Sequence, residues 1–229
     1  MRATTSPAHV LSLGLVPYEE AWDLQRRIAA DITDGSRPDT ILLLEHPPTI
    51  TTGRRTEPGE LHVPEGVEVD VVETDRGGKS TYHGPGQLVC YPILDLKRHG
   101  EDVKRYCRDL EEALILTLAK LGVPGERIDG LTGVWLTRPP RKIASIGIHI
   151  SRWVTTHGYA LNVDLDPAPF TQWITACGLE DATFTTIARE LGRPVSVDEV
   201  RGPALAALAE VFSLALEDAA APDLVALSN

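Results

Sequence analysis

Two neighbouring segments in the middle of the chain place small side chains on one face of an expected strand pair. In residues 142–151, KIASIGIHIS, side chains alternate with a period of two, and one face carries Ile143, Ser145, Gly147 and His149. Residues 157–163, HGYALNV, put small Gly158 and Ala160 on one face as well. Two adjacent strands with such faces would leave a slot instead of a filled core, so we expect a ligand site beside them.

The rest of the chain alternates between helical and extended patterns. Residues 18–34 carry one apolar stripe and end before Gly35, which predicts a helix, and residues 101–121 predict a second helix with Val103 and Cys107 among its inward positions. Shorter helices are expected at 170–174, from Thr185, and after a capping box of Ser196 with Glu199. Further strands are expected at 40–45, 49–53, 67–72 and 87–94. This order predicts an α+β class with a mixed β-sheet flanked by helices.

Length and charge limit the class of protein. No linker-like tract divides the 229 residues, and 42% of them are hydrophobic, so we expect one domain over residues 1–229. The formal charge of −11 argues against a nucleic-acid binder, and no signal-peptide pattern or membrane-length apolar run is present. Three widely separated cysteines suggest neither disulfides nor zinc. We expect a cytoplasmic protein without a metal.

The segment 75–92, DRGGKSTYHGPGQLVCYP, is rich in glycine and permits close approach of its backbone to a ligand. It is not a P-loop, because position 73, where that motif has its first glycine, is Glu73. It is not a dinucleotide fingerprint, because Gly84-Pro85-Gly86 precedes a strand pattern and not a helix. A glycine-rich hairpin without a binding role is the simplest alternative.

Cys177 is the cysteine with the sequence context of a nucleophile. It lies between Ala176 and Gly178 in an expected loop, whereas Cys90 and Cys107 fit buried structural positions. A nucleophilic thiol needs a nearby cation to stabilise its thiolate. Spacing alone does not choose among the candidates Lys79, His83, Lys142, His149 and His157.

Five short motifs follow one another along the chain. They are RGGKSTYHGPGQ at 76–87, YP at 91–92, KIASIG at 142–147, HGYALN at 157–162 and CG at 177–178. Together and in this order they resemble the lipoyl(octanoyl) transferase family, also called lipoate-protein ligase B. The resemblance runs from about Leu44 to Leu191, with one departure at Ala176, where the family commonly has proline.

The resemblance implies a cytosolic, monomeric acyltransferase with the biotin/lipoate protein ligase fold and no cofactor. Such an enzyme moves octanoyl from octanoyl-acyl carrier protein to a lysine of lipoyl domains in 2-oxoacid dehydrogenases and glycine-cleavage H protein, the first step of endogenous protein lipoylation. It also implies that Cys177 is the nucleophile, which forms an acyl-thioester, and that Lys142 is its base. The implied substrate-binding residues are Arg76, Gly77, Gly78, Lys79, Ser80, Thr81, Tyr82, His83, Ser145, Ile146, Gly147, Gly158, Tyr159 and Ala160.

Within this interpretation Gly77 and Gly78, opposite Gly147 and Gly158, leave a tunnel for an eight-carbon chain, each methylene contributing roughly 0.8 kcal/mol on burial. Two other functions remain open. An ATP-dependent lipoate or biotin ligase would share the fold and would need an anion-binding loop, for which Gly53-Arg54-Arg55 is a faint candidate. A non-catalytic acyl-carrier-binding module would use Cys177 only structurally.

Overall fold

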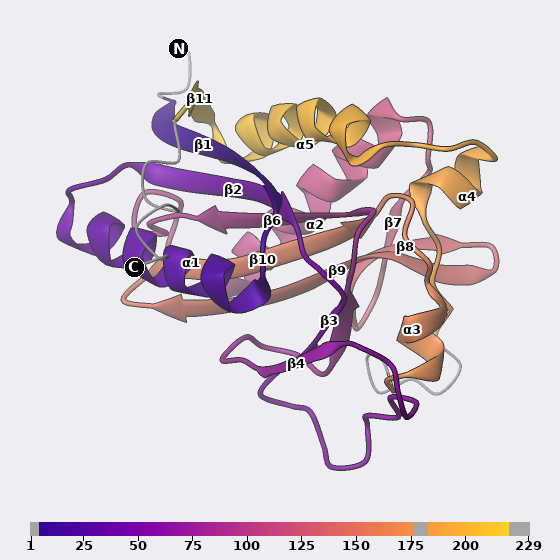
Figure 1. Ribbon diagram of the computed structural model, residues 1–229. Coiled ribbons are helices and arrows are strands. Elements are labelled where there is room, and N and C mark those ends of the chain that lie inside the picture. Colours follow the sequence, from indigo (N-terminus) through magenta and orange to yellow (C-terminus); the bar gives the residue numbers. More distant parts are fainter. Residues whose placement is uncertain (1–4, 176–182, 220–229) are drawn as a thin grey trace.

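A large mixed sheet forms the framework of the protein (Figure 1). The computed structural model describes residues 5–175 and 183–219. In spatial order the eight strands are β11 (Leu214–Asp218), β1 (Ser6–Leu15), β2 (Asp39–Glu45), β6 (Gln87–Ile93), β10 (Val154–Asn162), β9 (Pro140–Ser151), β8 (Leu131–Thr137) and β7 (Glu126–Ile128). β1 pairs in parallel with both β2 and β11, and the other neighbours in this sheet are antiparallel. The predicted α+β class with a mixed sheet is confirmed.

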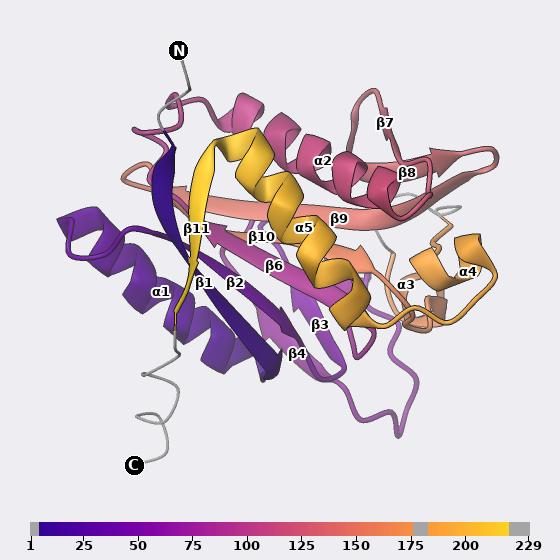
Figure 2. The same ribbon diagram turned by 90° about the horizontal axis from the view of Figure 1, so that it is seen from above.

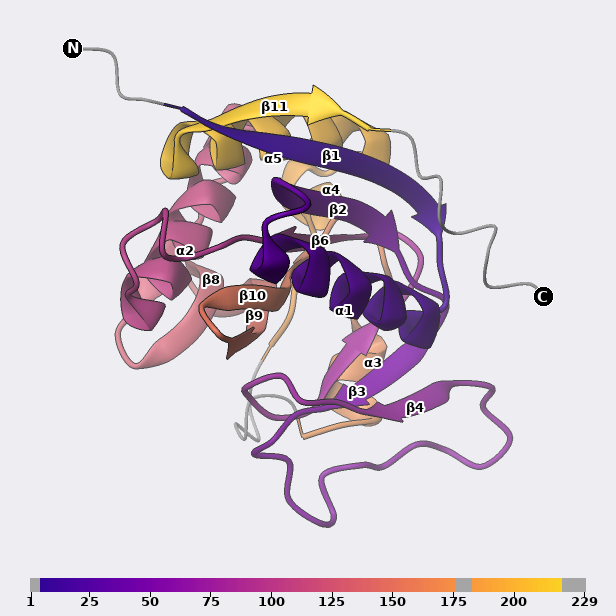
Figure 3. The same cartoon turned by 90° about the vertical axis from the view of Figure 1, so that its left-hand side faces the viewer.

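Helices cover both faces of this sheet. Figures 2 and 3 show α2 (Val103–Lys120) and α5 (Val197–Phe212) together on one face and α1 (Tyr18–Asp34) on the other. The first face carries the larger apolar cluster, and α1 closes a second cluster against β1, β2, β6 and β10. Burial on both faces explains why β2 and β6 are almost continuously apolar.

A smaller sheet lies beside the large one (Figure 1). Its order is β4 (Asp70–Glu73), β3 (Thr49–Thr52) and β5 (Thr81–His83). The short helices α3 (Ala168–Gln172) and α4 (Ile187–Leu191) complete the described elements, and a third apolar cluster joins Ile50 of β3 to Phe170 of α3. The glycine-rich segment begins in the loop between β4 and β5, contains β5, and continues into β6, so it links the small sheet to the large one.

Local signals set the helix ends. α1 has the predicted bounds, because Gly35 takes a left-handed conformation with φ 83° and stops it. The predicted capping box at Ser196 and Glu199 begins α5, and the Asp102 side chain caps α2. The prediction that Val103 points inward is wrong: it is 44% exposed, because it is the first residue of α2 and the buried face of this helix begins at Tyr106.

The strand predictions hold for β2, β3, β6, β9 and β10, with shifts of a few residues at their ends. β4 begins at Asp70, three residues later than predicted, because Thr49 to Thr52 pair with Asp70 to Glu73. β1, β5, β7, β8 and β11 were not predicted. In the described part of the chain, no helix is both long and apolar enough to cross a membrane.

Candidate active site

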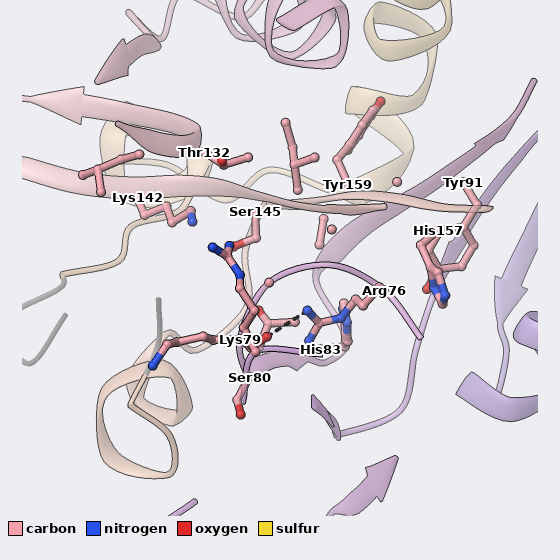
Figure 4. A pocket seen from close by; sticks show the side chains of 18 of the residues that line it. Arg76, Lys79, Ser80, His83, Tyr91, Thr132, Lys142, Ser145, His157 and Tyr159 are labelled. Atoms are coloured by element: carbon pink, nitrogen blue, oxygen red, sulfur yellow. Dashed lines mark hydrogen bonds between the residues drawn. The ribbon is translucent and has the colours of Figure 1, made fainter. Parts of the chain in front are cut away.

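A cavity of about 240 Å³ lies between the β9–β10 pair and the glycine-rich segment (Figure 4). In Figure 4, Lys142 and Ser145 of β9 lie at one end, and Tyr91 and His157 lie at the other. Predicted residues that line it are Arg76, Gly78, Lys79, Ser80, Thr81, His83, Lys142, Ser145, Ile146, Gly147, Gly158, Tyr159 and Ala160. The structure therefore brings three motifs, separated by up to about eighty residues, around one space.

Arg76 organises the glycine-rich segment. Its side chain is buried, and its guanidinium donates to the Thr51 carbonyl oxygen at 2.7 Å and to the Lys79 carbonyl oxygen at 2.8 Å. The segment is thus wrapped around a buried cation. Gly78 has φ 95°, a backbone conformation that favours glycine. Gly53 leaves the room for this packing, because a Cβ there would lie 2.5 Å from the Gly78 carbonyl oxygen.

Gly147 of β9 and Gly158 of β10 are paired in the sheet, but each allows a different part of the chain to approach closely. A Cβ on Gly147 would lie 3.0 Å from Cδ of Arg76, so this glycine makes room for the glycine-rich segment. A Cβ on Gly158 would lie 2.3 Å from the Cys90 carbonyl oxygen, so that glycine lets β6 approach. The slot expected beside Gly158 is therefore filled by β6, and Gly158 borders the cavity through its backbone.

Two predicted substrate-binding residues do not line the cavity. Tyr82 packs edge-on against Phe170 and Trp173, with ring centroids 5.7 Å and 5.6 Å away. Gly77 donates its backbone N–H to the Ile148 carbonyl oxygen at 2.8 Å, which ties the glycine-rich segment to β9. Lys79 lines the cavity and forms an ion pair with Glu60, whose hydrogen bond raises the pKa of Lys79.

Lys142 is 5% exposed and lies at the cavity wall. Its Nζ lies 5.1 Å from the centroid of the Trp135 ring, the residue opposite it on β8. Its backbone N–H donates to the Thr183 carbonyl oxygen at 2.8 Å, and its carbonyl oxygen accepts from the Thr185 N–H at 3.0 Å. The strand that carries Lys142 is therefore bonded to the chain that follows residue 182.

Cys177 lies outside the described residues. Before it, the Thr175 N–H donates to the Glu60 carbonyl oxygen at 2.9 Å. The two cysteines within the described ranges behave as structural residues: burial raises the pKa of Cys90 to about 12 and also raises the pKa of the half-buried Cys107. Neither thiol is poised to ionise near neutral pH.

The end of the cavity away from Lys142 is lined by polar side chains. His157 Nε2 lies 2.7 Å from Asp75 Oδ1, and the Tyr18 hydroxyl donates to His157 Nδ1 at 3.1 Å. Burial lowers the pKa of His157 and holds the pKa of His83 well below its usual value. Burial also raises the pKa of Tyr18 to about 12. Near neutral pH these three side chains present neutral hydrogen-bonding groups, and the charged groups beside them are the Asp75 carboxylate and the Arg76 guanidinium.

The sequence interpretation missed several lining residues. They are Tyr18 and Tyr91 at the polar end and a group from the β7–β8 turn and β8: Gly130, Leu131, Thr132 and Trp135. Arg55, which was considered only as part of an anion-binding loop, also lines the cavity. Tyr18 begins α1, far from every motif, so its sequence context carries no sign of a site. Over residues 5–175 and 183–219, no cluster of three His, Cys, Asp or Glu side chains has the geometry of a metal site.

Comparison with known proteins gives the family. The model of the lipoyl protein ligase A/B catalytic domain matches residues 17–209. The chain belongs to this family. The match extends from the start of α1 almost to the end of α5 and so includes every wall of the cavity.

Sequence relatives in this family carry one name. An octanoyltransferase of Mycobacterium tuberculosis strain H37Rv is 51% identical over 210 residues, covering 91% of this chain and 88% of the relative. An octanoyltransferase of Chloroflexus aurantiacus strain J-10-fl is 49% identical over 207 residues, covering 88% of this chain and 92% of the relative. The predicted family and the predicted acyltransferase class are confirmed.

Solved structures agree on the fold. Lipoate-protein ligase A bound with ATP has a TM-score of 0.67 at 14% identity and covers 98% of this chain and 92% of its own. A structure from a study of the bipartite lipoate protein ligase of Thermoplasma acidophilum and its E2 lipoyl domain has a TM-score of 0.67 at 15% identity, and the match covers 98% of this chain and 91% of the other. At such identities the likeness concerns the fold alone, and it confirms the predicted biotin/lipoate ligase fold.

Proposed function

We propose that this chain transfers octanoyl from octanoyl-acyl carrier protein to the lysine of lipoyl domains, through a thioester on Cys177, in the cytoplasm. The acceptors are the lipoyl domains of 2-oxoacid dehydrogenases and glycine-cleavage H protein. One observation carries the proposal: a buried lysine, Lys142, faces the cavity and is bonded through its backbone to the segment just after the one that contains Cys177. The name shared by relatives that match most of the chain supports the same substrate.

The reaction consists of two acyl exchanges. The Cys177 thiolate attacks the carbonyl carbon of the carrier thioester, the carrier thiolate leaves and takes up a proton, and a new thioester forms. The amine of the acceptor lysine then attacks this thioester, its C–N bond forms as the C–S bond breaks, and the excess proton passes by way of Lys142. Because a thioester replaces a thioester and an amide follows, no ATP is consumed.

The cavity suits the acyl chain better than a nucleotide. The glycine-rich wall is held by hydrogen bonds of the Arg76 guanidinium to the Thr51 carbonyl oxygen and of the Gly77 N–H to the Ile148 carbonyl oxygen. The Gly77 N–H is therefore already bonded within the protein, whereas a phosphate-binding loop would direct such groups at the ligand. The main alternative is an ATP-dependent ligase. The lipoate-protein ligase A structure bound with ATP is 14% identical to this chain, so the likeness supports a common fold and not a common use of ATP. A non-catalytic carrier-binding module is the other alternative, and it requires neither Cys177 nor Lys142.

Intact-mass measurement separates these functions. The purified chain is incubated with octanoyl-acyl carrier protein without ATP, and then with a lipoyl domain. We expect one octanoyl group on the enzyme, and its passage to the acceptor lysine. Cys177→Ala should abolish both steps, whereas Cys90→Ala, a matched control at a buried structural thiol, should retain them. A normal acyl-enzyme in Cys177→Ala, or transfer that requires ATP and free octanoate, would refute the proposal.

A further inference from the structure

Gly133 on β8 lies directly beside the side chain of Lys142. A Cβ built on Gly133 would lie 2.8 Å from Cε of Lys142, 3.4 Å from Nζ and 2.4 Å from the Ala144 carbonyl oxygen. The glycine has φ 108°, in the range that L side chains rarely adopt. Both the missing side chain and the unusual backbone of Gly133 are therefore needed to give the lysine its place at the cavity wall.

An irregularity in the β8–β9 pairing accompanies this arrangement. Val134 pairs with Ala144, but the next residue, Trp135, pairs with Lys142, so Ile143 is an extra residue on β9. A bulge of this kind bends its strand and redirects the neighbouring side chains. The Lys142 side chain consequently packs toward Trp135 and over Gly133.

A buried carboxylate on α2 holds the Gly133 peptide. Glu111 Oε1 accepts the Gly133 backbone N–H at 3.1 Å, and the Glu111 side chain is 3% exposed. The other oxygen, Oε2, accepts from Arg108 at 2.8 Å and from Arg127 at 3.2 Å. The two arginines thus share Oε2, whereas Oε1 binds the Gly133 N–H. If Glu111 served only to neutralise Arg108 and Arg127, it would not need the additional hydrogen bond to Gly133 of β8.

We infer that Glu111 is a positioning residue for Lys142, acting through the Gly133 peptide. Glu111 fixes Gly133 in its left-handed conformation, and Gly133 in that conformation gives the ammonium group its position in the cavity. For catalysis the inference rests on the proposed role of Lys142 in proton transfer. Displacement of a reacting group by about 1 Å can cost on the order of a hundredfold in rate.

Two conservative substitutions separate this role from simple charge neutralisation. Glu111→Gln keeps the side-chain length and an amide oxygen that accepts the Gly133 N–H, but it removes the charge opposite Arg108 and Arg127. Glu111→Asp keeps the charge but is one methylene too short to reach Gly133. Glu112→Ala is the matched control, because Glu112 is the next residue on α2 and binds Arg127 at 2.6 Å without contacting Gly133.

Two measurements are made on each variant. The first is the pH profile of acetylation of Lys142 by acetic anhydride, read by peptide mass spectrometry relative to the exposed Lys97 and Lys104. The second is kcat and KM for octanoyl transfer. We expect Glu111→Asp to change the relative acetylation of Lys142 by about threefold or more and to lower kcat by about tenfold, with KM nearly unchanged. Glu111→Gln should stay within about threefold of the parent in both measurements, and Glu112→Ala should match the parent.

The reverse order, with Glu111→Asp close to the parent and Glu111→Gln impaired, would overturn the inference in favour of charge neutralisation. Parental behaviour of both variants would overturn it as well. So would a Glu111→Asp chain that does not fold by circular dichroism, since the contact would then hold the fold and not the lysine. Acetylation of Lys142 does not require the enzyme to turn over. The positioning role of Glu111 can therefore be tested even if the chain does not transfer octanoyl groups.

Discussion

His46 is fully buried just after β2, and it makes the protein sensitive to acid. Its Nδ1 donates to the Val16 carbonyl oxygen at 2.6 Å, so its Nε2 is the acceptor for the Tyr91 hydroxyl at 2.7 Å. Burial lowers the pKa of His46 from 6.5 to about 4. The native state therefore binds the neutral imidazole more favourably than the protonated one, which has no acceptor nitrogen for the Tyr91 hydroxyl.

The size of the effect follows from the two pKa values. Between pH 6.5 and about 4 the unfolded chain binds a proton at His46 that the native protein does not bind, so stability falls as the pH falls through this window. The loss due to this one group amounts to about 2 kcal/mol at about pH 5 and about 3 kcal/mol at about pH 4. That is a substantial part of the few kcal/mol by which a typical domain is stable.

His46→Gln removes the titration but keeps one hydrogen bond, at a cost of about 1 kcal/mol near neutral pH. Urea unfolding of parent and variant, at pH steps from about 7 to about 4.5, should show the variant losing about 2 kcal/mol less on acidification. His62→Gln, which replaces an exposed histidine, should follow the parent. If His46→Gln loses as much stability as the parent does, the neutral buried ring is not the source of the acid sensitivity.

Two further outcomes follow from the cavity walls. Gly158→Ala should destabilise the protein by about 3 kcal/mol or more in urea unfolding, because the added Cβ would lie 2.3 Å from the Cys90 carbonyl oxygen. Gly147→Ala should cost less, about 1 kcal/mol, because its added Cβ would lie no closer than 3.0 Å to Arg76 and 3.2 Å to the Gly77 carbonyl oxygen. Equal costs would contradict this difference. Replacing exposed Arg54 and Arg55 with alanine should raise KM for the acidic carrier protein and flatten its salt dependence, because Arg55 lines the cavity, Arg54 is its neighbour in the chain, and the formal net charge of the protein is −11; unchanged values would exclude docking there.

The parts of the fold that local patterns specify were predicted from sequence. α1 has an apolar stripe and a terminal glycine, and β9 and β10 alternate clearly, so each was found. β1 and β11 were missed because their edges are completed by partners about two hundred residues away in the chain. β8 was missed because its buried face packs against the apolar cluster under α2, a contact that the local pattern of residues 131–137 does not reveal.

Most residues of the candidate site that lie within the five motifs were predicted from sequence, and most of those outside the motifs were not. Arg76, Lys142 and Ser145 were expected and do line the cavity, since each lies in a recognisable segment. Tyr82 was included with its motif, but alternation along β5 turns it toward Phe170 instead. Glu111 carries no sequence signal at all, because a buried carboxylate on an amphipathic helix is indistinguishable from an exposed one until the bulge opposite it is known.

The pairing of β1 with β11 has a consequence for synthesis of the protein. β1 leaves the ribosome about two hundred residues before β11, and in the described part of the chain Leu214–Asp218 complete the outer edge of Ser6–Val10. An unpaired strand edge is a template for association with other chains. Nascent chains on one messenger thus carry the same open edge until β11 has been synthesised, so products truncated or stalled before β11 are expected to aggregate through β1.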